Sequence, residues 1–217
     1  DEEAGVVYIP AQDNPLIYGM SEDWTQSGLY KRNPGGWNTG LEFGRITQLV
    51  VDNIADQPTP KGYLKAFDPL TGEDKWVVEI PHYWNGGVLS SAGGLVFQGD
   101  ALGMFTAYDK DTGEALWQFN TYTSMLAPPI TFEIDGEQFV SVLTGTGGGD
   151  LFGGEPLPPV AEHASLTYNN YGRLLVFKIG GTEQLPVPTV RDRSIPVQAD
   201  LVASNDQIAA GERHYNN

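Results

Sequence analysis

Short stretches of aromatic and apolar residues recur along the middle of the chain, separated by turns that contain glycine. Residues 63–67 (YLKAF) and 104–108 (MFTAY) are the length of a strand and rich in residues that favour β-structure. Each stretch is followed by an aspartate and then by a Thr-Gly pair, which is typical of a tight turn between antiparallel strands. The pattern therefore predicts two hairpins, whose second strands carry Trp76 and Trp117.

The two hairpins belong to an internal repeat with a period of 41 residues. Residues 62–76 read GYLKAFDPLTGEDKW and residues 103–117 read GMFTAYDKDTGEALW, so nine of the 15 positions are identical or similar. A catalytic residue is seldom duplicated at a fixed period. Large side chains that dock one repeat onto the next, in contrast, recur in every repeat. We therefore assign a structural role to the residues that the motif repeats: Asp68, Gly72, Trp76, Asp109, Gly113 and Trp117.

Two further strands are expected after each tryptophan, within residues 86–100 and 127–149, around short turns at 92–94 and 134–136. Each unit then holds about four strands in roughly 41 residues, which is the size of one propeller blade. Further strands are expected at residues 5–11 and 172–178. The sequence thus predicts an all-β fold, part of a β-propeller of about four blades with tryptophan-docking repeats.

The remaining segments divide the chain. Residues 1–181 are expected to form the propeller part, with a long loop at 12–61. Residues 182–207 contain three prolines and are typical of an extended linker, and residues 208–217 resemble the opening of a helix.

Composition excludes several classes of function. Acidic residues outnumber basic ones 28 to 12, for a net charge of −16, which argues against a nucleic-acid partner and against attraction to an anionic membrane surface. No apolar run is long enough to predict a membrane span. Cysteine is absent, which excludes disulfides, a thiol nucleophile, thiolate zinc sites and a covalent haem attachment motif within these residues.

The three histidines, His82, His163 and His214, have no nearby carboxylates in a metal-binding pattern, so no metal site is predicted. His82 precedes Trp84 by two residues. It is either close to the mouth of a site or an ordinary surface or hydrogen-bonded histidine.

The motif Ala-x-Asp-x-x-Thr-Gly-x-x-x-Trp resembles that of the eight-bladed quinoprotein alcohol dehydrogenases, which carry pyrroloquinoline quinone (PQQ) and a calcium or lanthanide ion at the propeller axis. Residues 5–12 (GVVYIPAQ) and 84–99 (WNGGVLSSAGGLVFQG) are also similar to segments of that family. Residues 211–215 (GERHY) resemble the start of the cytochrome c domain that follows the propeller in the quinohaemoprotein members.

The resemblance implies a site at Trp84, Asn85, Gly86, Gly87 and Val88, because this segment lies near the quinone in the family. Paired glycines let a backbone approach a flat ligand closely. The alternative is that Asn85-Gly86 forms a simple turn between strands. The family's catalytic aspartate, metal ligands, vicinal cysteine pair and quinone-binding arginine and lysine lie upstream of the matched part, so no catalytic or metal-binding residue is assigned to this chain.

The implied function is a portion of a PQQ-dependent alcohol dehydrogenase, completed by an N-terminal propeller half. Such an enzyme oxidises an alcohol to a carbonyl by hydride transfer to the quinone and passes electrons to haem c, in the fused cytochrome domain or a soluble cytochrome, in the periplasm. The alternatives are a non-catalytic propeller of PQQ-like repeats that acts as an assembly scaffold and, less favoured, a stand-alone half-propeller with open strand edges. The sequence leaves open which alcohol is oxidised, which metal is used, and whether the break before Asp1 is natural.

Overall fold

A computed structural model of the chain describes residues 1–14, 58–146 and 163–192, with isolated residues between 19 and 52 and between 204 and 208. The elements in these residues are β1 (Val7–Asp13), β2 (Lys61–Asp68), β3 (Glu73–Ile80), β4 (Asn85–Ser90), β5 (Leu95–Asp100), β6 (Met104–Asp109), β7 (Ala115–Asn120), β8 (Ile130–Ile134), β9 (Glu137–Thr144), the short helix α3 (Ala164–Thr167) and β10 (Arg173–Lys178).

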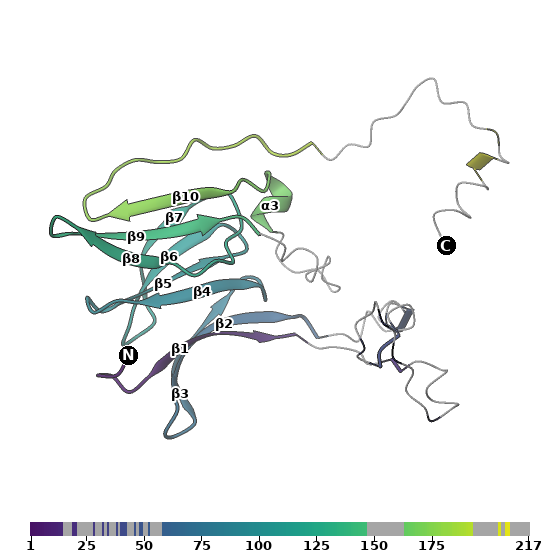
Figure 1. The fold of residues 1–217 in the computed structure, drawn as a ribbon, viewed down its shortest axis with the longest axis horizontal. Coiled ribbons are helices and arrows are strands. Elements are labelled where there is room, and N and C mark those ends of the chain that lie inside the picture. Colours follow the sequence, from purple (N-terminus) through teal and green to yellow (C-terminus); the bar gives the residue numbers. More distant parts are fainter. Residues whose placement is uncertain are drawn as a thin grey trace.

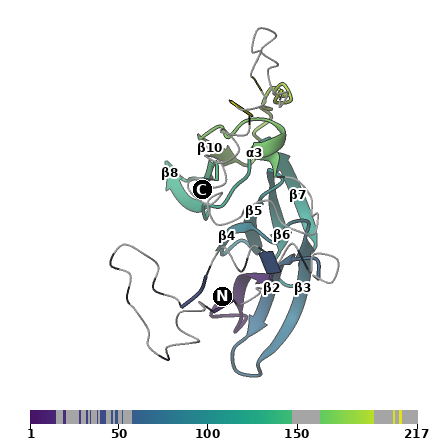
Figure 2. The same cartoon turned by 90° about the vertical axis from the view of Figure 1, so that its right-hand side faces the viewer.

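The strands form three antiparallel sheets that lie one above another (Figures 1 and 2). The strand orders are β1-β2-β3, β4-β5-β6-β7 and β10-β9-β8, called here the first, second and third sheets. The all-β prediction and the predicted hairpins are confirmed, and the described residues supply three sheets where the sequence predicted about four blades. Within the described residues, no helix is long and apolar enough to cross a membrane.

The second sheet is the one complete four-stranded unit among the described residues. Because β2 and β6 carry the same repeat, the first sheet lacks a counterpart of β4. The third sheet lacks a counterpart of β7, and the described residues after β10, from 179 to 192, form no strand. Each outer sheet is therefore one strand short of the middle one.

Apolar layers hold the three sheets together. Along β5, side chains alternate between faces, so Val96 packs toward the first sheet and Phe97 toward the third. Both faces of β5 are covered, which explains why its sequence is apolar at successive positions instead of alternating with polar residues. The two layers comprise Val6, Tyr8, Leu64, Ala66, Ile80, Val96 and Tyr108 on one side, and Phe97, Phe105, Ala107, Met125, Val140 and Val142 on the other.

The Thr-Gly turns form as predicted. Asp68 Oδ1 accepts the backbone N–H groups of Leu70 and Thr71, and Asp109 Oδ1 accepts those of Asp111 and Thr112. These hydrogen bonds favour the ionised carboxylates, and in Asp109 the Thr112 hydroxyl contributes most, so the pKa of both aspartates lies below its usual value. The glycine that closes each turn has a positive φ, 77° in the first turn and 75° in the second.

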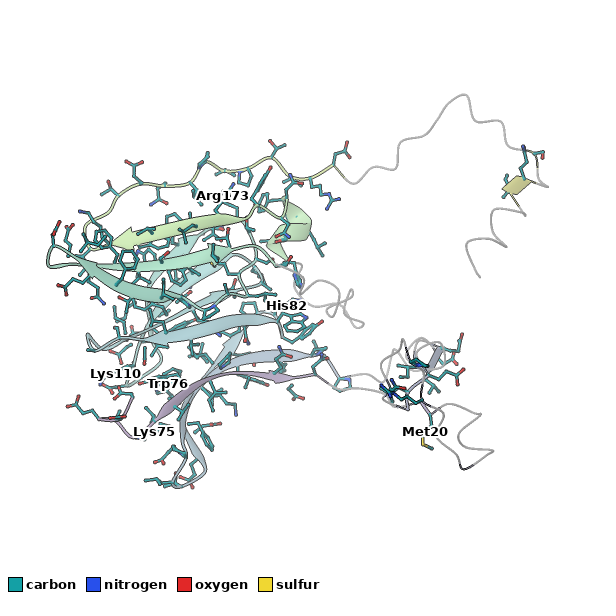
Figure 3. The ribbon with its side chains drawn as sticks, viewed as in Figure 1. Met20, Lys75, Trp76, His82, Lys110 and Arg173 are labelled. Carbon is teal, nitrogen blue, oxygen red and sulfur yellow. The ribbon has the colours of Figure 1, made fainter. Side chains whose placement is uncertain are left out.

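Trp76 docks the first sheet onto the second, as the repeat predicts. Its indole Nε1–H donates to the backbone oxygen of Lys110 in the β6–β7 turn at 3.0 Å. The hydroxyl of Tyr8 donates to the same oxygen, also at 3.0 Å, and the Tyr8 and Trp76 rings lie 5.8 Å apart. Figure 3 shows Trp76 and Lys110 at this junction. One turn of the second sheet therefore receives two aromatic side chains from the first.

Trp117 occupies the repeated position in the second sheet but is 40% exposed. Its ring packs edge-on against Phe177 of β10 at 5.4 Å. The third sheet has no Asp-x-x-Thr-Gly turn after β10 to accept the indole, and Trp117 instead lines a groove of about 640 Å³ between the second and third sheets. Both tryptophans therefore dock onto the next sheet, but in different ways. Trp76 is hydrogen-bonded to a turn of the second sheet, whereas Trp117 only packs against strand β10 of the third.

The two turn glycines provide a matched test of docking. Both Gly72→Ala and Gly113→Ala place a side chain at positive φ, which costs about 1–2 kcal/mol. Only at Gly113 would the new Cβ meet Trp76, at 2.8 Å from ring atom Cε3, whereas it would meet nothing within 4 Å at Gly72. We expect urea unfolding to show Gly113→Ala losing about 1–3 kcal/mol more than Gly72→Ala. Equal losses would contradict the docking of Trp76 against this turn.

Candidate functional site

The candidate segment Trp84–Val88 lies where the chain passes from the first sheet to the second. Residues 81–84 connect β3 to β4, and Asn85 begins β4 opposite Asp100 of β5. The Asn85 side-chain Nδ2 donates to the backbone oxygen of Ala11 in β1 at 3.3 Å. The segment is therefore anchored to both sheets. The alternative that Asn85-Gly86 forms a simple turn is wrong, because both residues lie inside β4, where the register with β5 shifts.

The paired glycines have a packing role within the protein. A Cβ at Gly86 would lie 2.7 Å from the backbone oxygen of Gly99, and one at Gly87 would lie 2.7 Å from Cβ of Pro128. The absence of side chains at these positions thus lets β4 approach β5 and the 125–128 segment. Close protein contacts account for both glycines, so the glycines by themselves do not require a flat ligand.

Gln98 supports the same segment and was not singled out by the sequence analysis. It is buried in β5, and its Nε2 donates to the backbone oxygen of Gly86 at 3.0 Å. Its Oε1 is buried without a hydrogen-bond partner among the described residues. The sequence did contain a signal for this residue, because Gln98 is the one amide side chain in the otherwise apolar run of residues 95–99.

The indole Nε1–H of Trp84 is buried and makes no hydrogen bond of standard geometry to the described residues, although a weaker interaction with the Tyr83 hydroxyl opposes the effect of burial on the pKa of Tyr83. A buried donor without a well-formed hydrogen bond can be satisfied by a water molecule or by a ligand acceptor. PQQ is planar and rich in carboxylate and carbonyl oxygens, so this donor fits it chemically. Neither the groove beside Trp117 nor the hollow of about 480 Å³ beside Arg173 is lined by Trp84–Val88.

The other predicted site features stand as follows. Among the described residues, no group of three or more histidine, aspartate or glutamate side chains could hold a metal ion. His82 is buried and hydrogen-bonded, and its ring meets that of His163 edge-on at 4.3 Å between centroids. His214 and residues 211–215 lie outside the described residues.

Asp100, opposite Asn85, is a partly buried carboxyl group that the sequence analysis did not identify. Its Oδ1 accepts the backbone N–H of Met104 at 2.8 Å. Burial raises the pKa of Asp100 to about 6, and backbone hydrogen bonds from residues 102–104 oppose this only in part. The geometry, a carboxylate closing the β5–β6 turn, indicates a structural role.

The pKa of Asp100 predicts a pH dependence of stability. Because the folded pKa is above the unfolded one, Asp100 favours folding most below pH 4, and that contribution is lost as the pH rises through about 6. Asp100→Asn keeps an acceptor for Met104 and removes the titration. We expect the variant to be more stable than the parent by about 1–3 kcal/mol at pH 7 and nearly equal at pH 4, by urea unfolding. The same difference at both pH values would contradict the assignment.

Comparison with known proteins places these features in a family. Residues 78–140 match the family model for the glucose/ethanol/alcohol dehydrogenase β-propeller domain. The chain is 37% identical over 216 residues to quinohemoprotein alcohol dehydrogenase ADH IIB of Pseudomonas putida, covering 97% of this chain and 28% of that protein. It is 42% identical over 190 residues to lupanine 17-hydroxylase [cytochrome c] of a Pseudomonas species, covering 88% of this chain and 24% of that protein.

The fold agrees with the sequence match. The solved structure of quinohemoprotein alcohol dehydrogenase ADHIIG from Pseudomonas putida HK5 superposes with a TM-score of 0.68 and 29% identity, covering 100% of this chain and 30% of that protein. The chain therefore spans 24% to 30% of the length of these relatives. In sequence and in fold, the chain belongs to the β-propellers of the PQQ-dependent alcohol dehydrogenase family.

Proposed function

We propose that the chain is one portion of a PQQ-dependent alcohol dehydrogenase and that residues outside it, including an N-terminal propeller half, complete the enzyme. The observation that carries this proposal is the match of nearly the whole chain to quinohemoprotein alcohol dehydrogenases, at 37% identity over 97% of its residues. The reaction proposed is oxidation of an alcohol to a carbonyl. The chain itself supplies propeller wall and one side of the cofactor pocket.

An exposed apolar face supports completion by further blades. In the third sheet, Leu143 and Leu174 lie directly opposite each other and are 56% and 65% exposed. Alternate residues of the same strands, such as Val140 and Phe177, pack instead toward the second sheet. The outward face is formed by Ile130, Phe132, Leu143, Leu174 and Val176. This largely apolar face, in which Ser141 separates Ile130 from Val176, is typical of a protein interface, and it continues the stacking of the three sheets.

A charge on this face is expected to prevent assembly. Leu174→Asp would bury an unpaired carboxylate between blades, which we expect to weaken co-purification with the remaining propeller by at least about tenfold. Leu70→Asp is the matched control, because Leu70 is 92% exposed at the tip of the β2–β3 turn. Affinity capture of the tagged propeller partner measures both. Normal co-purification of Leu174→Asp would contradict a blade interface on this face.

The cofactor proposal assigns Trp84, Asn85, Gly86, Gly87 and Val88 to the PQQ pocket. The indole N–H of Trp84, which makes no well-formed hydrogen bond within the described residues, would serve as a donor to the cofactor, and Gly86 and Gly87 would hold β4 in place behind it. When bound, PQQ supplies a carbonyl carbon that accepts hydride from the alcohol. The residues of this chain would bind the cofactor and orient it.

The remaining cofactors and partners are also proposals. The resemblance implies a calcium or lanthanide ion whose ligands lie outside this chain, and electron transfer to a cytochrome c that begins near residues 208–217. Two names among the relatives, quinohemoprotein and cytochrome c, refer to haem in those proteins. Residues 182–207 would link the propeller to that domain. We place the enzyme in the periplasm.

The non-catalytic scaffold is the second candidate, and one observation favours it. Gly86 and Gly87 are explained by contacts within the protein, as they would be in a propeller without cofactor. The buried indole N–H of Trp84, which lacks a well-formed hydrogen bond, and the enzymatic names of the relatives favour the dehydrogenase. Cofactor binding therefore decides between the two.

The test is alcohol-dependent reduction of an artificial electron acceptor by the assembled propeller, loaded with PQQ and calcium. We expect turnover with at least one alcohol of a varied series. Trp84→Ala should retain PQQ at least about tenfold less well through loss of its donor and ring. Trp117→Ala is the control, because Trp117 lies in the edge strand β7, and this variant should retain PQQ normally. An assembled protein that holds no PQQ would favour the scaffold.

A further inference from the structure

His82 lies in the connection that leads into the candidate segment, between the end of β3 at Ile80 and the start of β4 at Asn85. Its side chain is 1% exposed. The imidazole stacks on the neighbouring Tyr83 ring at 4.7 Å and meets the His163 ring edge-on, at the end of the sheets where α3 lies (Figure 3). A buried histidine in this place has to be explained either by packing or by the polar contact that it makes.

The polar contact is specific. Nδ1 of His82 accepts the backbone N–H of Trp84 at 2.9 Å. This is a local bond from a side chain to the backbone two residues ahead, the arrangement with which asparagine and aspartate close a turn. It holds Trp84 in a bent connection from which β4 departs. Nδ1 can accept only when it carries no proton, so the bond requires the neutral ring with its proton on Nε2, and that N–H is buried without a hydrogen-bond partner among the described residues.

The surroundings favour that neutral form. Burial and, to a smaller extent, repulsion from His163 together lower the pKa of His82 to about 4. The backbone of the same residue is held as well, because the Gly62 Cα lies against the His82 carbonyl oxygen, where a Cβ would overlap it. The ring and the main chain of His82 are thus both fixed.

We propose that His82 is a positioning residue, which sets the backbone of Trp84 through its Nδ1 acceptor and thereby orients the Trp84 indole and the start of β4. In its cofactor part, this inference rests on the function proposed above. His82 belongs neither to the repeated motif nor to the candidate segment Trp84–Val88, so the inference adds a further residue to the proposed site.

Two variants separate positioning from packing. His82→Asn shortens the side chain but places Oδ1 where Nδ1 now accepts the Trp84 N–H. His82→Leu keeps a bulk closer to that of the ring and removes the acceptor. If His82 positions Trp84, asparagine replaces it better than leucine does. If His82 only fills space, leucine replaces it better, because the smaller asparagine leaves a cavity and a buried amide.

The first measurement is hydrogen exchange at the Trp84 amide by NMR, relative to the amides of β5, in the full chain without cofactor. We expect His82→Asn to stay within a few-fold of the parent and His82→Leu to exchange at least about tenfold faster at Trp84. Val142→Ala, at a buried position of β9 outside the reference strand, controls for general destabilisation and should leave the relative protection of Trp84 unchanged. Unchanged protection in His82→Leu, or equal loss in His82→Asn, would overturn the positioning role.

The second measurement is PQQ retention by the assembled propeller after gel filtration. We expect the parent and His82→Asn to retain PQQ and His82→Leu to retain at least about tenfold less. A parent that binds no PQQ would overturn the proposed function but leave the exchange result to decide the role of His82. Equal retention by the parent and His82→Leu would overturn the link between His82 and the cofactor.

Discussion

Trp76→Ala is expected to lower the free energy of unfolding by about 3–4 kcal/mol. The variant removes a large ring from the junction of the first and second sheets and leaves the Lys110 carbonyl oxygen with one of its two aromatic donors, Tyr8. Trp76→Phe should lose less, because it gives up the N–H donor and only part of the ring. Urea unfolding followed by circular dichroism measures both losses.

Trp117→Ala is the matched control for Trp76→Ala. Trp117 has the same place in the repeat but is 40% exposed and packs on Phe177 without a turn to accept it. We expect its loss to be about 1–2 kcal/mol. A loss at Trp117 equal to or greater than that at Trp76 would show that the turn at Lys110 does not contribute what the geometry indicates.

Gly62→Ala is expected to disrupt the entrance to the candidate site. The new methyl group would overlap the carbonyl oxygen of His82, which is backbone and cannot rotate away as a side chain could. The connection between β3 and β4 would have to shift, and with it Trp84 and Asn85. We expect a loss of about 3 kcal/mol or more in urea unfolding, with weaker PQQ retention in the assembled protein.

Gly172 supplies the control for Gly62. It precedes β10 as Gly62 precedes the core of β2, but a Cβ there would meet nothing within 4 Å. Gly172→Ala should therefore be neutral or stabilise by up to about 1 kcal/mol, because it restricts the unfolded chain. If Gly62→Ala were as stable as Gly172→Ala, the close approach of β2 to the His82 connection would be disproved.

The repeat predicted the parts of the fold that depend on local chemistry. The Asp-x-x-Thr-Gly turns form because the aspartate and the glycine satisfy the turn within a few residues, and the flanking apolar stretches become β2, β3, β6 and β7. The unequal docking of Trp76 and Trp117 also had a signal, because the third unit lacks the turn motif after residue 178.

Contacts between distant residues were beyond the sequence. The hydroxyl of Tyr8 reaches a carbonyl 102 residues away, and no pattern marks that pairing. A glycine pair in a sequence shows only that something approaches closely. At Gly86 and Gly87 the neighbours are Gly99, Met125 and Pro128, which the folded chain alone brings together. The burial of His82 was likewise undetectable, because its neighbour His163 lies 81 positions further along the chain.

The most direct test of the central claim is the composition of the protein purified from its native source. Intact mass and quinone content should be measured together, with PQQ determined from its absorbance after denaturation. The account predicts that the 217 residues travel with the remaining propeller, as one polypeptide or as two in equal amounts, with about one PQQ per complex. A lone chain that binds no quinone, even after PQQ and calcium are added, would contradict it.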